Sequence, residues 1–363
     1  MFKSIQVPGP TQLILPFVLL LLLVSAGGVT PVLAQSEDAP KPEKLFESSQ
    51  TLAVSLSAPW GTIVRDKNNQ SPYAATIEFV DSLGNRNSIP LMVERRGLTR
   101  QAVCKFPPIK LLFDKERVKG TTFRGENSLK LVTHCDRGSK WEQYYVKEML
   151  AYQMYNLITD LSFRVQPLSI TYVDSGRGSE DGPRFAFLIE DDSDVAKRND
   201  MKKLDASKVS PRQLEPVEAS RFALFQYMIA NVDFAATVGP DAGKCCHNAR
   251  LIGLSEVSDI YSIPYDFDSS GMVDAHYAAP HESLPIRNVT TRLFRGYCIH
   301  NSTLDTARQE FLAQEQAIYA LVRNESRLSE RSAKSVLSYL QRFFDTLRNP
   351  AEFQENVIQK CRK

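Results

Sequence analysis

The chain has 363 residues, and its 44 Lys and Arg against 42 Asp and Glu give a formal net charge of +2. A nearly neutral chain without a basic tract is not typical of proteins whose main partner is nucleic acid. The hydrophobic fraction of 43% is that of an ordinary globular protein. The chain is therefore long and apolar enough for one large two-lobed domain or two ordinary ones.

The first 34 residues have the pattern of a secretory signal peptide. Lys3 precedes an apolar run from Leu13 to Ala26, and Val32-Leu33-Ala34 has the small residues of a signal peptidase site. An uncleaved membrane anchor is the alternative, but this run is shorter than the roughly 20 residues that span a bilayer. No later segment is apolar enough to span. We therefore expect cleavage before Gln35 and a secreted or periplasmic protein.

The cysteine count is even, which favours disulfides in an exported chain. The six cysteines are Cys104, Cys135, Cys245, Cys246, Cys298 and Cys361. We expect Cys104 to pair with Cys135, because both fall in the same β-rich region. Adjacent Cys245 and Cys246 are expected to pair with different partners. With His247 they could instead form a soft metal site, although they lack the spaced ligand pairs of structural zinc sites.

Short β-type runs separated by turn signals dominate the first half of the chain. Leu83-Gly84-Asn85 has the composition of a hairpin loop between two of these runs. The expected strands are 76–80, 89–93, 109–113 and 128–132, followed by 168–173 and 184–189.

Helical spacing of apolar residues begins near Trp141, returns in Pro216–Ala230, and fills the last 60 residues from about Thr303, with a break near 326–329. The order of elements predicts an α+β protein with segregated lobes. The expected divisions are a flexible linker at 35–50, a β-rich N-lobe at 51–190 and a mostly helical C-lobe at 191–363.

Polar residues that suit a hard cation follow the apolar helix and a later strand. Asn231 and Asp233 come after the helix, Asn248 follows an insertion rich in Gly, Pro and Cys, and Asp266 and Asp268 end a strand. Mg²⁺ prefers one or two carboxylates, an amide oxygen, and water or phosphate oxygens. A separate carboxylate can orient or deprotonate an attacking hydroxyl. These residues therefore predict metal-assisted chemistry at the end of the helix.

The same order of motifs is found over roughly residues 75 to 275. It consists of Glu94-Arg95-Arg96-Gly97, a Lys-containing strand at 104–111, Leu129-Lys130-Leu131 before a helix with Glu148, a strand pair from Val165 to Glu190, and the polar residues of the preceding paragraph. In this order the chain resembles the spore-coat-protein-H-like (CotH-like) kinase family, a secreted atypical branch of the protein kinases. The resemblance implies a bilobal protein-kinase-like fold.

The resemblance also implies roles for the acidic residues and their amide neighbour. Asp233 would be the catalytic acid that orients or deprotonates the acceptor hydroxyl. Asn248 and Asp266 would hold Mg²⁺, with Asp268 as a second carboxylate ligand.

Basic residues have implied roles on the nucleotide. Lys105 or Lys110 would contact the phosphates of ATP and pair with Glu148 on the helix, and the position of Lys105 before a Pro pair favours it. Arg95 or Arg96 would also reach a phosphate. The implied reaction is phosphoryl or nucleotidyl transfer from ATP to a hydroxyl of a protein or a small molecule.

The insertion between Asp233 and Asn248 departs from the family pattern. Residues 234–247 stand where kinase catalytic loops have four residues. Either a disulfide-bonded loop returns Asn248 to the site, or the two residues do not act together. The alternative function is a non-catalytic kinase-like scaffold or a binding protein of the cell envelope. A serine hydrolase has no support because Gly-x-Ser-x-Gly is absent, and a glycosidase has no positive support.

Overall fold

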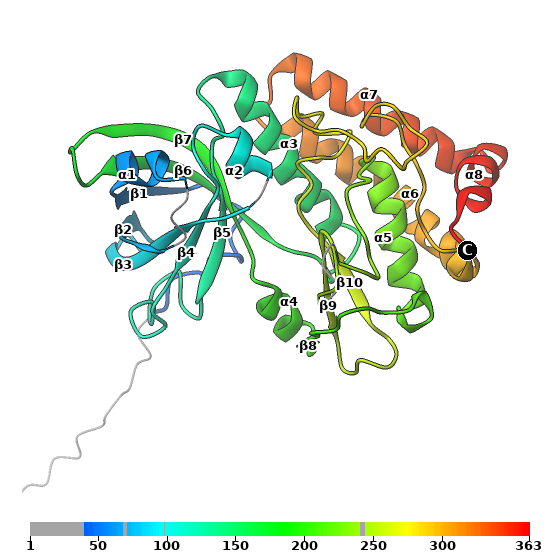
Figure 1. Ribbon diagram of the computed structural model, residues 1–363, viewed down its shortest axis with the longest axis horizontal. Coiled ribbons are helices and arrows are strands. Elements are labelled where there is room, and N and C mark those ends of the chain that lie inside the picture. Colours follow the sequence, from blue (N-terminus) through cyan, green and yellow to red (C-terminus); the bar gives the residue numbers. More distant parts are fainter. Residues whose placement is uncertain (1–39, 68–70, 98, 240–243) are drawn as a thin grey trace, which may run out of the picture. The chain divides into compact units, whose positions relative to one another are not determined.

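The computed structural model describes residues 40–67, 71–97, 99–239 and 244–363. The expected signal peptide, residues 1–34, lies outside the described residues. Lys41 to Lys363 form one compact unit. Its strands up to residue 189 and its long helices gather on different sides of this unit (Figure 1).

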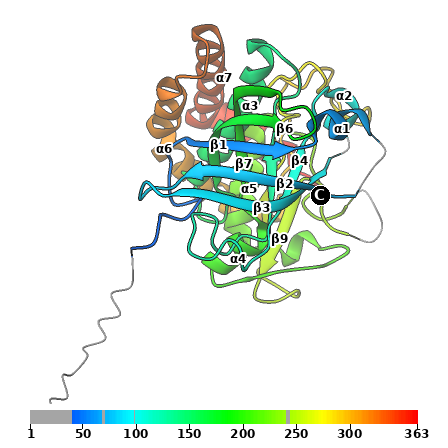
Figure 2. The ribbon, with the colours of Figure 1, turned by 90° about the vertical axis from the view of Figure 1, so that its left-hand side faces the viewer.

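Seven strands form a closed barrel in the order β1-β2-β3-β4-β5-β7-β6. Neighbouring strands pair antiparallel, except that β1 pairs parallel with β6 and so closes the barrel. Figure 2 looks toward this part of the molecule, with β1, β2 and β3 in front. The strands are β1 (Leu52–Ala58), β2 (Tyr73–Val80), β3 (Arg86–Arg95), β4 (Ile109–Leu112), β5 (Ser128–Val132), β6 (Val165–Asp174) and β7 (Glu180–Ile189).

The closed barrel overturns the expected bilobal protein-kinase-like fold. The expected strands are present, and β2 and β3 form the predicted hairpin around Gly84. The sequence pattern does not indicate the parallel pairing of β1 with β6, in which Val54 lies opposite Ile170. This pairing joins the two ends of the sheet, so the β-rich part is a barrel and not an open lobe.

The barrel interior is filled by alternate side chains of its strands. Leu111 of β4 lies opposite Leu129 of β5, and both are fully buried. Between these apolar positions, Lys110 and Lys130 lie opposite each other with partly exposed side chains. Because successive side chains of a strand point to opposite faces, the two lysines are on the outer face of the barrel.

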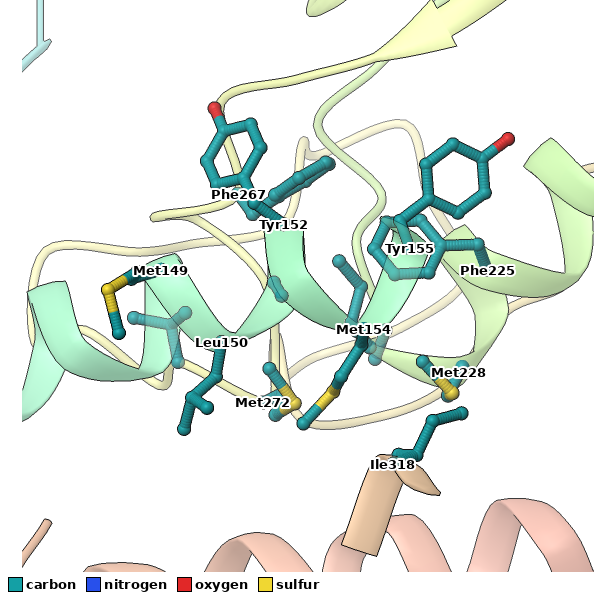
Figure 3. Packing of buried hydrophobic residues seen from close by; sticks show 14 of the residues in the cluster. Met149, Leu150, Tyr152, Met154, Tyr155, Phe225, Met228, Phe267, Met272 and Ile318 are labelled. Carbon is teal, nitrogen blue, oxygen red and sulfur yellow. The ribbon is translucent and has the colours of Figure 1, made fainter. Parts of the chain in front are cut away.

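Helices form the second half of the unit and enclose the larger apolar core. In Figure 3, Met154 and Tyr155 of α3 lie beside Phe225 and Met228 of α5, with Ile318 of α6 nearby. The longer helices are α3 (Ser139–Asn156), α5 (Pro216–Met228), α6 (Leu304–Asn324) and α7 (Glu330–Arg348). The break between α6 and α7 confirms the one predicted near 326–329. Within the described part of the chain, none of the helices is both long and apolar enough to cross a bilayer.

Shorter elements complete the fold. A small sheet has the order β10-β9-β8 and lies near α4 (Figure 1). The short helices are α1 (Trp60–Arg65), α2 (Thr99–Val103), α4 (Asp192–Arg198) and α8 (Pro350–Asn356); the strands are β8 (Lys202–Lys203), β9 (Ala249–Gly253) and β10 (Tyr261–Pro264); and the 3₁₀ helices are η1 (Pro211–Gln213), η2 (Cys298–Thr303) and η3 (Ile358–Lys360).

All six cysteines are paired. Cys104–Cys135 is confirmed, with the two Cα atoms 4.6 Å apart. The expectation of different partners for Cys245 and Cys246 is wrong, because their Cα atoms lie 3.0 Å apart and their sulfurs are bonded to each other. The third pair joins Cys298 and Cys361. Disulfides persist in oxidising environments, so these pairs fit an extracellular protein.

Candidate functional site

Asp233 is positioned by the turn that follows α5. Ala230 leaves the helix with a left-handed backbone (φ 48°), and its carbonyl accepts a hydrogen bond from the Gly271 N–H at 3.1 Å. The side-chain oxygen of Asn231 then accepts the N–H of Asp233 at 3.0 Å. This Asx turn is what Asn favours at a helix end. It fixes the backbone of Asp233 and leaves its side chain 44% exposed.

The insertion returns the chain to Asp233. Ala235 and His247 form an isolated antiparallel bridge. The side-chain amide of Asn248 donates to the Asp233 carbonyl at 2.7 Å and to its carboxylate Oδ2 at 3.1 Å. Asn248 itself has a left-handed backbone (φ 48°), which Asn tolerates better than most residues. Asp233 and Asn248 are therefore adjacent despite residues 234–247 between them.

His247 is the second partner of Asp233. Its Nε2 lies 2.7 Å from Asp233 Oδ1, and this hydrogen bond raises the pKa of the imidazole. The soft metal site considered for Cys245, Cys246 and His247 is not formed, because the two sulfurs are bonded to each other. No local pattern in the sequence indicates that His247 contacts Asp233, because the two residues are 14 positions apart and meet only in the folded chain.

Asp266 and Asp268 follow β10 and have different surroundings. The backbone N–H of Asp266 donates to the Tyr152 hydroxyl at 2.8 Å, in a left-handed conformation (φ 64°). Its carboxylate accepts no hydrogen bond from the described residues. The buried carboxylate of Asp268 accepts from the Tyr277 hydroxyl at 3.0 Å. Burial and the nearby Asp266 raise the pKa of Asp268 to about 6.

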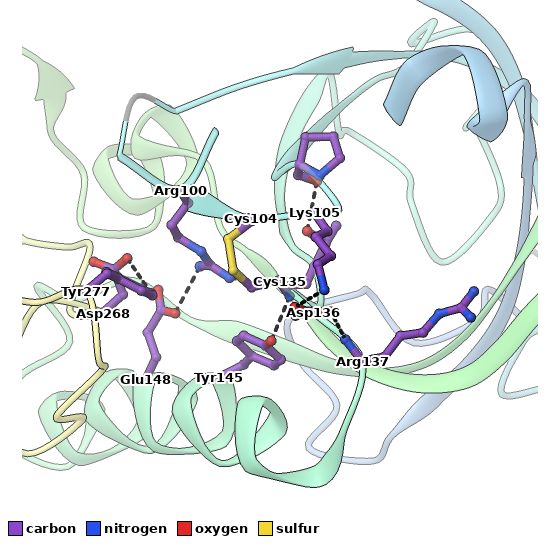
Figure 4. Close-up of a disulfide and its surroundings, with 12 residues drawn as sticks. Arg100, Cys104, Lys105, Cys135, Asp136, Arg137, Tyr145, Glu148, Asp268 and Tyr277 are labelled. Atoms are coloured by element: carbon purple, nitrogen blue, oxygen red, sulfur yellow. Dashed lines mark hydrogen bonds and ion pairs between the residues drawn. A yellow bond between two sulfur atoms is a disulfide. The ribbon is translucent and has the colours of Figure 1, made fainter. Parts of the chain in front are cut away.

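Glu148 faces the same cluster from α3. It is fully buried, and it forms an ion pair at 3.3 Å with Arg100 of α2 (Figure 4). Burial raises the pKa of Glu148 to about 8; Arg100 opposes this shift, while Asp268 and Asp266 add to it. Its Oε1 has no hydrogen-bond partner in the described part of the chain. Buried carboxylates thus lie close together with one arginine beside them.

The expected pairing of Glu148 with a lysine is wrong. Lys105 forms an ion pair with Asp136 at 2.8 Å, and its side chain is 80% exposed. In Figure 4 it lies across the Cys104–Cys135 disulfide from Glu148. Lys110 pairs with Glu94 at 3.1 Å. The salt bridge needs a cation on the side of the disulfide that faces α3, and Arg100 occupies that position.

Arg95 and Arg96 lie in different environments. Arg95 is buried and donates to the Ile63 carbonyl at 2.7 Å. Arg96 is partly exposed, its Nε is buried without a hydrogen-bond partner among the described residues, and its charge acts on Glu148 and Lys130. Of the two arginines, Arg96 therefore has the donor that is still available.

Lys130 is a cation to which the family resemblance assigns no role. Its Nζ lies 5.0 Å from the centre of the Tyr265 ring, next in sequence to Asp266. Burial, together with the charges of Arg96 and Arg250, lowers the pKa of Lys130 to about 8. A signal was present in the sequence: a lysine between Leu129 and Leu131 on a strand must point away from the barrel interior.

A metal at this position would depend on few protein ligands. The described residues contain no group of three or more His, Cys, Asp and Glu arranged to hold an ion. Asp266 fits Mg²⁺ best because its carboxylate has no hydrogen-bond donor within the described chain, and Asn248 uses only its amide nitrogen in hydrogen bonds. Asp268 is less available because Tyr277 donates to it. One carboxylate and one amide oxygen, completed by water and phosphate, is a set that Mg²⁺ accepts.

No family model matches the chain, and no curated protein sequence matches it either. The arrangement of side chains is thus the basis for assigning a function. A cavity of about 370 Å³ opens beside Asp233 and His247, and Arg295 and His281 also line it. Space for an acceptor group is therefore present next to the Asp233 carboxylate, whose side chain is 44% exposed.

Proposed function

We propose that this protein is a Mg²⁺-dependent transferase that moves the terminal phosphoryl group of ATP to a hydroxyl of a protein or small molecule. The observation that carries the proposal is the approach of two sets of opposite charge. Asp266, Asp268 and Glu148 form one set. Of the cations, Arg96 acts on Glu148, and Lys130 lies over the ring of Tyr265, the residue before Asp266. A magnesium–triphosphate complex carries both signs of charge and suits such a site.

Arg96 and Lys130 would bind the phosphates. The unpartnered Nε of Arg96 is a hydrogen-bond donor, and Lys130 is a second cation within its electrostatic reach. Phosphate oxygens are strong acceptors for such donors. Because bringing a triphosphate near Lys130 would favour its charged form, binding would also offset the burial that lowers its pKa.

Asp233 would orient the acceptor hydroxyl and accept its proton. Its carboxylate is held by His247 and Asn248 and is open to the adjoining cavity. Asp266 and Asn248 would hold Mg²⁺, which neutralises phosphate charge when it is bound. A positioned base of this kind contributes about 10² to 10⁴ in rate.

The proposal includes export and the resemblance to the spore-coat-protein-H-like kinases, but not their bilobal fold, which the barrel replaces. A cleaved signal peptide at residues 1–34 agrees with the three disulfides. We propose that the chain uses the same kind of residues on a different architecture.

Thermal unfolding with ATP and Mg²⁺ tests the binding part of the proposal. At 100 times the dissociation constant a ligand stabilises the native state by about 2.7 kcal/mol, which raises Tm by about 4 °C or more in a chain of this size. We expect this rise for the wild type and its loss in Asp266→Asn. Asp274→Asn is the matched control, because Asp274 is also an aspartate with a left-handed backbone (φ 51°).

Conversion of ATP to ADP, followed by phosphorus NMR, tests the reaction. Asp233→Asn should keep the thermal response to ATP and Mg²⁺ and slow ADP formation by about 10²-fold or more. A wild type whose Tm ignores ATP with Mg²⁺ would end the proposal. Binding without any ADP formation, with acceptor proteins of the same secretory fraction added, would replace the enzyme with a nucleotide-binding scaffold.

A further inference from the structure

A second cavity lies in the barrel part of the molecule, where α1 follows β1. Its volume is about 960 Å³, within the range of small-molecule sites. Aromatic side chains form much of its lining: Trp60 of α1, Phe106, His134 and Tyr172 of β6. None of the acidic residues of the candidate site lines it, so the cavity is a separate feature of the fold.

Two buried polar atoms in the lining have no partner. His134 is 6% exposed and Tyr172 is 2% exposed, yet His134 Nδ1 and the Tyr172 hydroxyl make no hydrogen bond to any residue that the structure describes. Burial lowers the pKa of His134 to about 4, so its ring is neutral at pH 7 and can either donate or accept. A buried polar group without a partner is destabilising, and a bound ligand is one way to satisfy it.

The aromatic rings are held in place by one another. Phe106 stacks on His134 with ring centres 4.3 Å apart, and Trp60 packs edge-on against Tyr172 at 5.2 Å. The indole N–H of Trp60 already donates to the Leu56 carbonyl at 3.0 Å. The indole therefore offers the cavity only its apolar surface. Such walls favour a flat, ring-containing ligand.

Some of the charged side chains at the rim of the cavity form ion pairs, and others do not. Asp136 is paired with Lys105, and Asp181 is paired with Arg137 and Arg184. Asp174, beside these, accepts the Gly61 N–H at 2.8 Å. Arg65 and Arg177 line the cavity without an ion pair to any described residue, and so does Glu180.

Arg177 is held near the base of α1. A Cβ added at Gly61 would lie 3.2 Å from the Arg177 guanidinium carbon and 2.8 Å from Asp174 Oδ2. Only glycine lets the helix approach both side chains so closely. The arginine therefore lies beside the aromatic wall, and its charge is available at the mouth of the cavity.

We propose that this cavity binds a small molecule with a planar ring, a hydrogen-bonding group that reaches His134 and Tyr172, and a negatively charged group that Arg65 and Arg177 receive. The aromatic lining holds the ring, and the two unpartnered polar atoms select its substituent. The inference does not depend on phosphoryl transfer. It also gives Lys105 a place at the rim of this cavity, away from Glu148.

Titration calorimetry with three related compounds tests each feature. The probe is 6-hydroxy-2-naphthoate, which carries a ring, a hydroxyl and a carboxylate. The comparators are 2-naphthoate, which lacks the hydroxyl, and 2-naphthol, which lacks the carboxylate. We expect the probe to bind saturably and each comparator about tenfold more weakly, because each loses one polar contact.

Variants assign the two ends of the ligand. Tyr172→Phe should weaken binding of the probe about tenfold and leave binding of 2-naphthoate unchanged, because only the probe has a hydroxyl that can pair with the hydroxyl of Tyr172. Arg177→Gln should weaken both carboxylates about tenfold and leave 2-naphthol unchanged. Arg86→Gln is the control, since Arg86 is exposed in the β2–β3 hairpin and does not line the cavity.

The result that overturns the proposal is equally defined. If folded wild-type protein binds none of the three compounds, the cavity is not a site of this class. If 2-naphthol binds as tightly as the probe, the anionic part of the proposal fails. Thermal unfolding of each variant shows that it is folded, and Tyr172→Phe should be no less stable than the wild type because it removes an unpartnered hydroxyl.

Discussion

The barrel interior and the acidic cluster of Asp266, Asp268 and Glu148 are built on opposite principles, although Asp268 and Glu148 are buried as the barrel core is. Inside the barrel, leucine, valine and isoleucine side chains meet across neighbouring strands without polar atoms. In the cluster, carboxylates repel one another and one oxygen of Glu148 lacks a partner. Apolar burial stabilises a fold, whereas crowded buried carboxylates destabilise it. This contrast separates the part that holds the protein together from the part that is suited to bind charge.

The largest effect on stability should come from the barrel. Leu111 is fully buried, with 0% of its surface exposed, and it lies opposite Leu129. Leu111→Ala should lower the free energy of unfolding by about 4 kcal/mol, since it removes apolar contacts and leaves a cavity. Urea denaturation measures the change. Leu83→Ala, at a leucine that is 45% exposed, should change it by less than about 0.5 kcal/mol. Equal effects at the two positions would mean that the barrel interior is not the packed core.

The next effect on stability concerns the disulfide that links the chain after α2 to the chain before α3. Cys104 follows α2, which carries Arg100, and Cys135 precedes α3, which carries Glu148. Replacing both cysteines with alanine should lower stability by about 3 kcal/mol, because the bond closes a loop of sequence separation 31. It should also weaken any ATP–Mg²⁺ response, because Arg100 loses its anchor beside Glu148.

The Cys298–Cys361 pair provides the control for this prediction. It closes a longer loop and does not adjoin α2 or α3 in sequence. Replacing it should lower stability to a similar degree without changing the ATP–Mg²⁺ response of the protein that remains folded. If both double variants lose the response equally, the first disulfide has no special relation to the acidic cluster.

The acidic cluster should reveal itself in the pH dependence of stability. The pKa of Glu148 is near 8 in the folded chain and 4.5 ordinarily. Between these values the unfolded chain has released a proton that the folded chain retains, so stability falls as pH rises. Between pH 5 and pH 8.5 the free energy of unfolding should fall by roughly 2 kcal/mol more in the wild type than in Glu148→Gln.

Urea denaturation at several pH values measures this difference. Glu142→Gln, on the same helix but outside the cluster, should keep the wild-type pH dependence. If Glu148→Gln keeps it as well, the carboxylates are not crowded in the way that the structure indicates. The part that remains in Glu148→Gln should include Asp268, whose pKa is also raised.

The same contrast explains what could be predicted from the sequence. Strands such as β2 and β3 were found because alternating apolar residues flank a Gly-containing turn, and that signal is local. Closure of the barrel was missed because β1 and β6 are far apart in the chain. Their pairing depends on how the intervening strands twist, which no local pattern encodes.

At the candidate site the same limit applies to partners. The sequence brought Asp233, Asn248 and Asp266 to attention by residue type, and the structure places Asn248 on Asp233. It could not select Arg100 over Lys105 as the partner of Glu148. That choice is made by the short helix α2, whose place is fixed through Cys104.

The smallest effect should be at the edge of the cluster, where His247 meets Asp233. Hydrogen bonding to the carboxylate raises the pKa of His247 above its ordinary 6.5. The stabilisation from this pair is therefore complete below pH 6.5 and is lost as pH rises through the raised value. Both side chains are more than a third exposed, so solvent screening keeps the effect on stability small.

Proton NMR of the imidazole ring measures this pair directly. The titration midpoint of His247 should lie above 6.5 in the wild type and fall in Asp233→Asn, whereas Asp274→Asn should leave it unchanged. A midpoint that ignores Asp233 would mean that the two side chains do not meet in solution. Asp233 would then lack its partner, and the cavity beside it would no longer contain an oriented carboxylate. The His247–Asp233 pair holds the residue that is proposed to accept a proton. Its effect on stability is the smallest of the predicted effects, but its presence or absence bears most directly on the proposed reaction.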